Sequence, residues 1–312
     1  CSPPAHSLIA DYFPPEQRAS ALSIYALGIP IGSILGLLAG GWVAEFYGWR
    51  TAFFVVGVPG VLLAIAFKLS IREPIRGMSD AAAPVAGEQP PLGATIRTLL
   101  SNRTMVHLAM GGGLTAFVGY GLGQWLPAMF IRLHGLGVGE TATYFGLVLG
   151  VASAVGTLIG GAIADRFAGR DRRVYAWLPA AGVLVAFPFF VVGLLLDQPY
   201  VAIVVLITPY LLNSLWLGPV FGTIQNLAPM RMRALASAVL LFILNIIGLG
   251  LGPLIVGVVS DLLIGVFGGE SLRYSILIST AVYFWAGAHF LLAARTIRQD
   301  LDAASAASRV GA

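Results

Sequence analysis

Charge and cysteine are the scarce components of this 312-residue chain. Only 10% of its residues are Asp, Glu, Lys or Arg, whereas a soluble domain carries roughly 25%. A chain with so little charge cannot cover itself with a hydrated surface, which excludes soluble, disordered and nucleic-acid-binding proteins. The single cysteine, Cys1, permits neither an internal disulfide nor a thiolate metal site.

Motifs that carry chemistry are also lacking. The chain has no glycine-x4-glycine-lysine loop to cradle a phosphate, so ATP is not expected to drive its activity. No nucleophile, base and metal ligands gather at one depth, so we expect no catalytic residue, no cofactor, no metal and no enzymatic activity. His107 and His289 each stand alone in the sequence, which favours a packing role over a proton carrier.

Long apolar stretches are abundant instead. Hydrophobic residues make up 58% of the chain, and its mean hydropathy is +0.87. A helix that crosses a bilayer needs roughly 20 apolar residues with its charges at the ends. The stretches that meet this requirement are 20–44, 51–70, 104–131, 141–164, 174–196, 200–228, 234–262 and 272–294. The sequence therefore predicts an all-α integral membrane protein, with the lipid bilayer as its solvent.

The basic residues predict the orientation of these spans. Of the 18 Lys and Arg residues, only Arg50, Arg132 and Arg273 fall on one side of the alternating spans. The positive-inside rule places the other side in the cytoplasm, together with the Pro- and Gly-rich linker at 71–102 and the tail at 297–312. We expect a multi-pass protein of the inner (cell) membrane, and the net charge of +4 calls for no nucleic-acid partner.

An internal repeat relates the two ends of the chain. Residues 215 positions apart match, and after a one-residue slip the match resumes. The matching pairs are Pro4 and Pro219, Ile9 and Ile224, Asp11 and Asn226, Pro14 and Pro229, Arg18 and Arg233, Ala19 and Ala234, Gly36 and Gly252, Gly41 and Gly257, and Glu45 and Asp261. The stub at 1–13 and the next two spans thus repeat as the last three spans, while the three spans at 104–196 have no counterpart.

The repeat predicts a larger whole. If two equal six-helix bundles make up the protein, about three and a half helices precede Cys1, and the chain begins at the end of the fourth. We therefore expect the remainder of the N-terminal bundle at 1–70, the linker at 71–102, the C-terminal bundle at 103–296 and a cytoplasmic tail at 297–312. Such a fragment would lack some neighbours of its first two spans.

Two signatures resemble those of the major facilitator superfamily. The loop Gly161-Ala-Ile-Ala-Asp-Arg-Phe-Ala-Gly-Arg170 is similar to the superfamily signature that follows its second and eighth helices. Gly32, Gly36, Gly40 and Gly41 fit the glycine signature of antiporters, except that Leu37 replaces its proline; Gly248, Gly252, Pro253 and Gly257 repeat the pattern with the proline present. More narrowly, residues 2–30 resemble bacterial members of the spinster-like branch.

The resemblance implies a secondary transporter that works by alternating access between two pseudo-symmetric bundles. The spinster-like branch implies proton coupling, as an antiporter or a symporter, and a small amphiphilic or organic solute, such as a lysolipid. The branch's coupling carboxylates would lie upstream of Cys1. A monomer is expected. Two alternatives remain open: a proton-coupled drug or organic-anion transporter of another branch, and a non-transporting membrane receptor or scaffold.

The loop signature implies a gate on the cytoplasmic side. Asp165 is expected to accept backbone N–H groups near Arg18 and so to latch the two bundles together. Asp11 would play the matching role for the missing repeat of the loop, and Arg166, Arg170 and Arg233 are expected to belong to the same gate. The alternative is that Asp165 and Arg166 are solvated loop charges.

Two further sets of residues are singled out within the spans. The glycine ladders predict tightly packed seams that block the leakage of coupling ions, with ordinary helix contact as the alternative. Polar and aromatic side chains in mid-span are candidates for cargo contact, with interhelical hydrogen bonding as the alternative. The cargo candidates are Tyr25, Tyr120, Gln124, Trp125, Tyr210, Asn213, Trp216 and Asn245.

Overall fold

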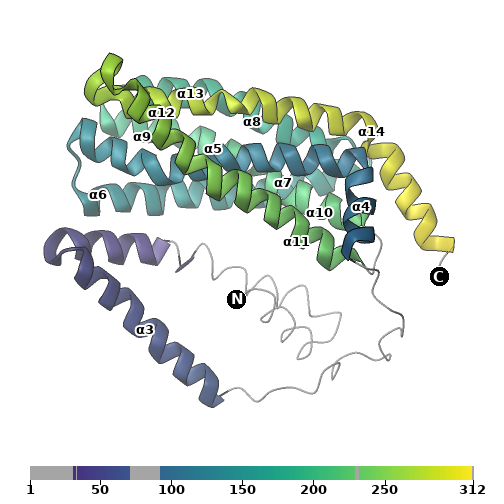
Figure 1. Cartoon of the computed structure of the whole chain (residues 1–312), viewed down its shortest axis with the longest axis horizontal. Helices are drawn as coiled ribbons and strands as arrows, with labels where there is room; N and C mark the ends of the chain where they lie inside the picture. Colours follow the sequence, from purple (N-terminus) through teal and green to yellow (C-terminus); the bar gives the residue numbers. More distant parts are fainter. Residues whose placement is uncertain (1–30, 33, 71–91, 229–231, 311–312) are drawn as a thin grey trace. The chain divides into compact units, whose positions relative to one another are not determined.

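The computed structural model describes residues 31–32, 34–70, 92–228 and 232–310, and every regular element in these ranges is a helix (Figure 1). The stub, most of the linker and the start of the span at 20–44 lie outside the described residues, and so do Asp11, Arg18 and Tyr25. The chain divides into two compact units. The first contains Gly137–Gly150 and the helices before the linker, and the second contains Pro90–Leu136 and Val151–Ala312.

The first unit pairs an early helix with a short segment from the middle of the chain. Its elements are the helix Ile34–Tyr47, α3 (Trp49–Ser70), α6 (Val138–Thr143) and the π-helix η1 (Tyr144–Leu149). Gly48 joins the first two helices at a φ of +82°, which an L side chain rarely adopts. Gly41 lies against Ala142 on α6, so the helix Ile34–Tyr47 and α6 approach each other closely.

The second unit is a helical bundle. Its elements are α4 (Leu92–Ser101), α5 (Arg103–His134), α7 (Gly150–Ala168), α8 (Val174–Leu195), α9 (Pro199–Asn213), the 3₁₀-helix η2 (Ser214–Trp216), α10 (Leu217–Leu227), α11 (Arg233–Ile243), the π-helix η4 (Leu244–Leu251), α12 (Gly252–Phe267), the 3₁₀-helix η5 (Gly268–Glu270), α13 (Ser271–Thr280) and α14 (Val282–Val310). We call the end that carries α4 and the last turns of α14 the linker end, and the end that carries Gly135 and Arg273 the distal end.

The bundle is built around α5, most of which is buried. Asn102 begins this helix, because its side-chain Oδ1 accepts a hydrogen bond of 2.9 Å from the amide of Met105. Gly135, with a φ of +68°, ends it. Along its length α5 packs against α14 on one side and against η4 and α12 on another (Figure 1).

Three consecutive glycines explain how close these neighbours come. Glycine weakens a helix by about 1 kcal/mol relative to alanine, so a run of three is unfavourable on propensity alone. At Gly111 a methyl group would meet the ring of Phe290 from α14, and at Gly112 it would meet the ring of Trp216. The glycines of α5 therefore make room for aromatic rings from the neighbouring helices.

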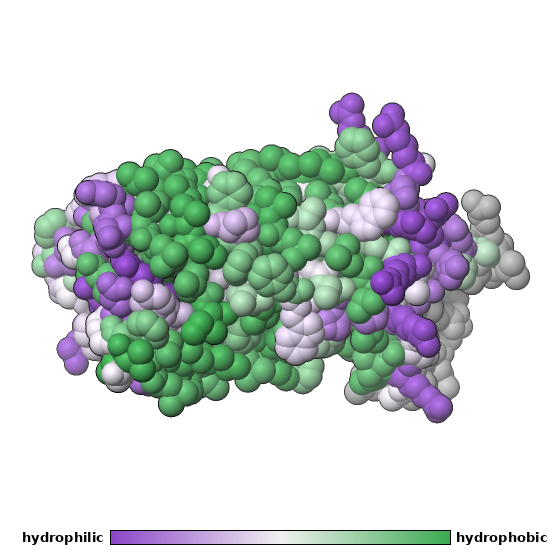
Figure 2. Space-filling model, turned by 90° about the horizontal axis from the view of Figure 1, so that it is seen from above, coloured by the Kyte–Doolittle hydropathy of each residue, from purple (hydrophilic) through white to green (hydrophobic). Residues whose placement is uncertain are grey.

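The predicted spans agree with the observed helices. Within the described part of the chain, six helical stretches are long and apolar enough to cross a membrane: Trp49–Ser70, Arg103–His134, Val138–Ala168, Val174–Leu195, Pro199–Ile224 and Leu235–Ala304. The last of these contains both of the spans predicted at 234–262 and 272–294. On the face in Figure 2, hydrophobic residues cover the middle and hydrophilic residues gather toward the two ends. The chain is an all-α, multi-pass membrane protein.

Two helical segments lie in regions for which no span is predicted. The linker region at 71–102 includes a helix, α4, because its Leu99 finds an apolar partner surface and is only 4% exposed. The tail at 297–312 is also helical as far as Val310, because α14 continues beyond the apolar part of the span. Its Ile297 is fully buried and its Leu301 is 6% exposed, so the first turns of the tail still pack against the bundle.

Two spans contain a π-helix that the sequence did not predict. η1 lies within the predicted span 141–164, and η4 within the span 234–262. π-Helical turns inside α-helices are rare and occur often at functional sites. Pro253 follows η4 in the first turn of α12, where its missing N–H leaves no hydrogen bond unmade.

Candidate substrate pathway and gates

Two predicted cargo residues share a face of α5 that the bundle leaves uncovered. Tyr120 and Gln124 lie one turn apart, and both are exposed, as is Gly123 between them. We call these three residues the α5 polar face. A polar side chain that faces lipid in mid-span is costly, so this face is better suited to line a water-filled pathway than to contact hydrocarbon.

Asn245 also remains exposed, in the π-helix η4. Its Nδ2 donates a hydrogen bond of 2.7 Å to the carbonyl oxygen of Leu241 in the preceding turn. Its Oδ1 is left available as an acceptor on the surface of the helix. Gly248, one turn later, lies against Tyr120 and Ala116, so η4 packs directly beside the α5 polar face.

Trp125 and Trp216, by contrast, are used within the bundle. The Nε1 of Trp125 donates a hydrogen bond of 2.8 Å to the carbonyl oxygen of Pro253, which ties α5 to α12. Trp216 is 7% exposed and packs on Gly112. Both residues therefore make the interhelical contacts that were the alternative to cargo contact.

Tyr210 and Asn213 belong to a polar and aromatic cluster inside the bundle. The Oδ1 of Asn213 accepts a hydrogen bond of 2.9 Å from the hydroxyl of Tyr283, which is fully buried in α14. The ring of Phe190 lies between those of Tyr210 and Tyr283, with centroid distances of 5.8 Å to each. The cluster joins α8, α9 and α14, and the side chain of Asn213 is engaged in a contact between helices.

The glycine ladder of η4 and α12 forms a seam with α5. Gly252 lies against the backbone at Phe117 and Gly121, and Gly257 lies against the ring of Trp125. A methyl group at Gly252 would collide with main-chain atoms, which cannot rotate away. The close approach predicted for this ladder is therefore present, and it is made with α5.

The ladder of the helix Ile34–Tyr47 makes less contact. Only Gly41 approaches a neighbour closely, at Ala142 on α6. Around Gly32, Gly36 and Gly40, no described residue lies within 4 Å of where a methyl group would be. Leu37, which replaces the proline of the signature, packs on Gly146 of η1. A role of these glycines in a leak-proof seam remains a prediction.

The predicted gate residues lie at the linker end or outside the described part. Asp165 and Arg233 belong to α7 and α11, but their side chains are not among those described. Arg166 and Arg170 are exposed, and the guanidinium of Arg170 lies 6.0 Å from the centroid of the Phe167 ring. The latch between Asp165 and the region of Arg18 therefore stays a prediction.

An ion pair joins the loop signature to the tail. A guanidinium nitrogen of Arg172, in the turn between α7 and α8, lies 2.9 Å from a carboxylate oxygen of Asp302 on α14. Both side chains are well exposed, so the pair contributes little to stability. It lies next to Leu301, whose burial holds this turn of α14 against the bundle.

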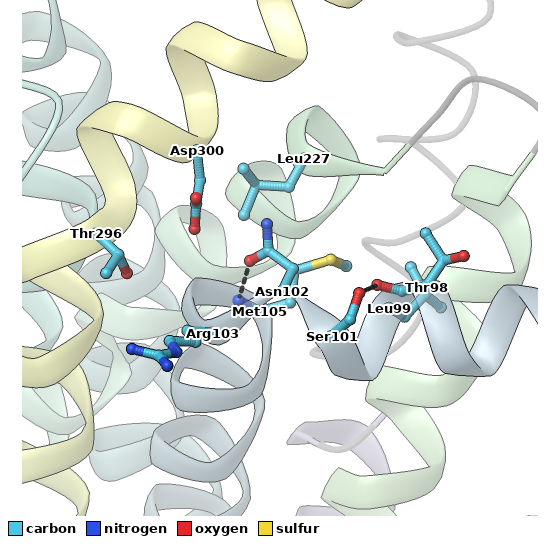
Figure 3. A pocket seen from close by; sticks show the side chains of 9 residues that line it. All are labelled: Thr98, Leu99, Ser101, Asn102, Arg103, Met105, Leu227, Thr296 and Asp300. Atoms are coloured by element: carbon cyan, nitrogen blue, oxygen red, sulfur yellow. Dashed lines mark hydrogen bonds between the residues drawn. The ribbon is translucent and has the colours of Figure 1, made fainter.

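A cavity of about 480 Å³ opens at the linker end. Figure 3 shows Thr296 and Asp300 projecting from α14 toward the junction of α4 and α5. The residues that line the cavity are Thr98, Leu99, Ser101, Asn102, Arg103, Met105, Leu227, Thr296 and Asp300. Most of them are polar, and they include one acidic and one basic side chain, so the cavity is suited to hold water or a polar solute.

One wall of this cavity is hydrogen-bonded to a fully buried hydroxyl. Thr104 donates to the Oδ2 of Asp300 over 2.5 Å, and its Oγ1 also lies 2.5 Å from the Oγ1 of Thr296. A hydroxyl carries one hydrogen, so Thr296 must be the donor of the second bond if Thr104 donates to Asp300. The three side chains form a short chain of hydrogen bonds that ends on a carboxylate.

His107 and His289 form a pair, although each stands alone in the sequence. Their Nδ1 atoms are 3.0 Å apart across the contact between α5 and α14, and their ring centroids are 5.2 Å apart. Both rings are half-buried. Among the described residues, no group of three or more His, Cys, Asp and Glu side chains is arranged to hold a metal ion.

In the first unit, two hydrogen bonds that the sequence did not predict join the helix Ile34–Tyr47 to α6. The carboxylate of Glu45 accepts a hydrogen bond from the amide of Gly139, in the first turn of α6. Beside it, the Nε1 of Trp42 donates to the Oγ1 of Thr143 over 3.0 Å. A carboxylate in this position is also favoured by the helix dipole. The contact could have been predicted from Glu45, an acidic residue that follows the glycine ladder by one turn.

One buried arginine forms ion pairs with two acidic residues at the distal end of the bundle. Arg273 is 7% exposed, and its guanidinium lies 3.3 Å from the carboxylate of Asp197 and 3.4 Å from that of Glu270. Asp197 precedes α9 and Glu270 precedes α13, so the arginine connects two turns of this end. The sequence showed Arg273 only as a charge at the start of a span.

Comparisons with known proteins agree with this architecture. Residues 1–253 match the family described as Major Facilitator Superfamily. An MFS-type efflux pump from Mycolicibacterium smegmatis is 31% identical over 303 residues, which cover 96% of this chain and 69% of the pump. Protein spinster homolog 1 from Homo sapiens is 29% identical over 326 residues. That match covers 95% of this chain, which spans only 60% of the human protein's length.

A solved structure shows the same fold. It is the crystal structure of a bacterial homolog to the human lysosomal transporter Spinster, in an inward-facing and unoccupied conformation. Its TM-score with this chain is 0.85 at 30% identity, over 96% of this chain and 75% of that one. The resemblance noted in the sequence, the helical bundle and these matches agree, and the chain belongs to the major facilitator superfamily of transporters, with spinster-like relatives.

Proposed function

We propose that this chain acts in a proton-coupled secondary transporter that works by alternating access and moves a small amphiphilic or organic solute, such as a lysolipid. Family membership supports transport in general. The similarity to an efflux pump and to a spinster homolog supports export and a spinster-like role. The chain spans 60% to 69% of those proteins, so the activity of the whole protein is inferred. Alternating access is consistent with the fold.

The α5 polar face is the observation that carries this proposal. Tyr120 and Gln124 lie in the middle of a long apolar helix, yet neither is covered by the bundle. Uncovered polar groups in mid-span are expected to face a water-filled cavity, where a solute passes. An aromatic hydroxyl beside an amide suits a solute with both a polar and an apolar part, and Asn245 is proposed to extend the lining. Tyr25, outside the described residues, stays a predicted cargo residue of the other bundle.

A second candidate is a drug or organic-anion exporter of another branch. The 31% identity to an efflux pump favours it specifically. The two candidates share the fold and the pathway and differ in the solute, so they are separated only by offering both kinds of solute to the same protein.

We also propose the orientation and the boundaries of the two bundles. The linker end would lie on the cytoplasmic side of the inner membrane, because Arg97, Arg103 and Arg172 gather there. Arg132 and Arg273 lie toward the distal end. Residues 1–70 and 103–296 would belong to the two bundles. The region 71–102 would link them and would include α4, and the protein would work as a monomer.

The gate proposed for the linker end rests on Asp165. At the end of α7 its carboxylate would accept backbone N–H groups near the start of the span at 20–44, and Asp11 would do the same for the missing repeat of the loop. Arg18, Arg166, Arg170 and Arg233 would surround these carboxylates. Such a latch would close the cytoplasmic side while the cavity faces outward.

Transport in reconstituted liposomes tests the proposal. The solutes to be offered are a fluorescent lysophosphatidylcholine and, for the exporter, ethidium. The variants are Gln124→Leu and Asp165→Asn, with Val204→Leu as the matched control at an exposed, apolar position of α9. We expect a pH gradient to drive uptake, a protonophore to abolish it, and both test variants to slow it by about tenfold or more.

The outcomes separate the candidates. Uptake of ethidium but not of the lysolipid assigns the exporter instead. A response of Gln124→Leu no larger than that of Val204→Leu contradicts the assignment of the α5 polar face, and normal transport by Asp165→Asn contradicts the latch. No uptake of any solute under any gradient contradicts transport itself.

A further inference from the structure

A line of polar side chains follows the contact between α5 and α14. These two helices pack side by side over most of their length (Figure 1). From the linker end inward, the line contains Asp300, then Thr104 with Thr296, and then His107 with His289. Apolar residues follow, beginning with the ring of Phe290 over Gly111. The polar line therefore leads from the linker-end cavity to the histidine pair and stops there.

The outer part of this line is in contact with the cavity. Thr296 and Asp300 line the cavity, and Asp300 presents its carboxylate toward the junction of α4 and α5 (Figure 3). Thr104 is completely buried behind them. The chain of hydrogen bonds through these three side chains joins water in the cavity to the interior of the bundle, and hydroxyl groups can both accept and donate a proton.

The step from Thr104 to His107 is short. The two residues lie on the same face of α5, three positions apart, which corresponds to about 5 Å along the helix. A single water molecule can bridge such a gap between polar groups. The linker-end cavity is therefore the nearest source of protons for the histidine pair.

The geometry of the pair limits the number of protons that it holds. At 3.0 Å, the two Nδ1 atoms form a hydrogen bond only if one ring donates its N–H and the other offers a lone pair. At least one ring is then neutral. If the acceptor nitrogen gains a proton from the cavity, two N–H groups face each other, the bond is lost and the pair gains one positive charge.

The charged groups nearest the pair in sequence belong to α5 and α14. Arg103, one turn before His107 on α5, is the positive charge that acts on that ring. On α14, the ring of Trp285 lies 6.2 Å from that of His289, and Asp300 is the nearest acidic residue in sequence. The neighbouring helices add little: α10 has no ionisable side chain, and α8 has only Tyr175, in its first turn. α14 also carries Arg295 and Arg298, both exposed, and α4, which packs on α5, carries the exposed Arg97.

We propose that His107 and His289 form a proton-binding site within this bundle, which is loaded from the linker-end cavity through Asp300, Thr104 and Thr296. Loading transfers one proton from a hydronium ion in the cavity to the accepting Nδ1, leaves a water molecule behind, and loosens the contact between α5 and α14 at that level. This site is separate from the carboxylates that the family resemblance places upstream of Cys1. It goes beyond the proposed function and does not depend on the identity of the solute.

Nitrogen NMR on protein labelled with ¹⁵N-histidine tests the site directly. The chain contains four histidines, so the signals can be assigned from single variants. At neutral pH we expect a coupling across the hydrogen bond between the two Nδ1 nuclei, and we expect it to disappear as the pH falls. His107→Gln and His289→Gln remove the coupling at every pH, whereas the matched control His134→Gln, at the other end of α5, leaves it in place.

The route is tested by the rate of loading. Asp300→Asn keeps an oxygen that can accept from Thr104 but removes the charge, and Asp302→Asn is the matched control on the same helix. In liposomes subjected to a pH jump on the linker side, Asp300→Asn should slow protonation of the pair by about tenfold or more. Asp302→Asn should leave the rate unchanged.

Two results overturn the inference. The site is absent if the coupling persists unchanged from pH 8 to pH 4.5, or if no coupling is found at any pH. The route is wrong if Asp300→Asn and Asp302→Asn load the pair equally fast. None of these measurements requires transport, so failure of the proposed function and failure of this site are distinguished.

Discussion

Two helices of this protein carry the same spacing of glycines and use it differently. In η4 and α12, Gly248, Gly252 and Gly257 all lie against α5, two of them against main-chain atoms. In the helix Ile34–Tyr47, only Gly41 meets a neighbour closely. A ladder of small residues therefore permits a close approach without requiring one, and a facing helix with its own glycine, such as Gly121, is what completes the seam.

Each seam also contains a tryptophan that donates to the partner helix. Trp125 donates to a carbonyl oxygen of α12 from a half-buried position, whereas Trp42 donates to a threonine hydroxyl of α6 in an exposed position. The seam between α5 and α12 is thus closer, drier and bonded to main chain. It is expected to be rigid, and the contact between Ile34–Tyr47 and α6 is expected to adapt more easily.

The largest effect is expected from Gly252→Ala. Its methyl group would meet the main chain at Phe117 and Gly121, so helices must move apart, at about 3 kcal/mol of unfolding free energy. The matched control is Gly250→Ala, which meets only an ordinary contact within its own helix and should gain up to about 1 kcal/mol from helix propensity. Detergent titration of unfolding measures both; equal stability of the two variants would contradict the seam.

Gly41→Ala should have a smaller effect. Here the methyl group meets the side chain of Ala142, and the less constrained contact can open, so we expect a loss of about 1–2 kcal/mol. Gly40→Ala, one position earlier, meets no described residue and is the control, with no loss expected. If both variants lose stability equally, the difference drawn between Gly41 and its neighbours is wrong.

The smallest expected effect is the difference in unfolding free energy between the variants Trp125→Phe and Trp42→Phe. Trp125→Phe keeps an aromatic ring but leaves the carbonyl of Pro253 without its donor, which should lower the unfolding free energy by about 1 kcal/mol. Trp42→Phe should change it by less than about 0.5 kcal/mol, because water can replace an exposed hydrogen bond. The same unfolding titration compares them, and a larger loss from Trp42→Phe would reverse the order of the two seams.

The sequence predicted the fold well because the bilayer imposes simple rules. A span must be apolar for about 20 residues, and its charges must lie at the ends. These rules placed the spans at 51–70, 104–131 and 174–196 within a few residues of the observed helices. They carry no information on short helices that do not span the membrane, so they do not predict α4, whose Leu99 is only 4% exposed.

The site was less predictable, because its contacts join distant residues. His107 and His289 are 182 positions apart, and Thr104 and Asp300 are 196 apart, so no local pattern reveals either pair. Residue type alone identified Tyr120 and Trp125 as candidates. Only the packing of the helices shows that Tyr120 is uncovered and that Trp125 donates a hydrogen bond to the carbonyl oxygen of Pro253.

The ion pair between Arg172 and Asp302 has a practical consequence for following motion. Because Ile297 and Leu301 are buried and the pair lies one residue beyond Leu301, α14 is held against the bundle as far as Asp302. A fluorescent or spin label attached there would report displacement of the whole helical body. Breaking the pair should change that report little, because the neighbouring apolar side chains remain buried.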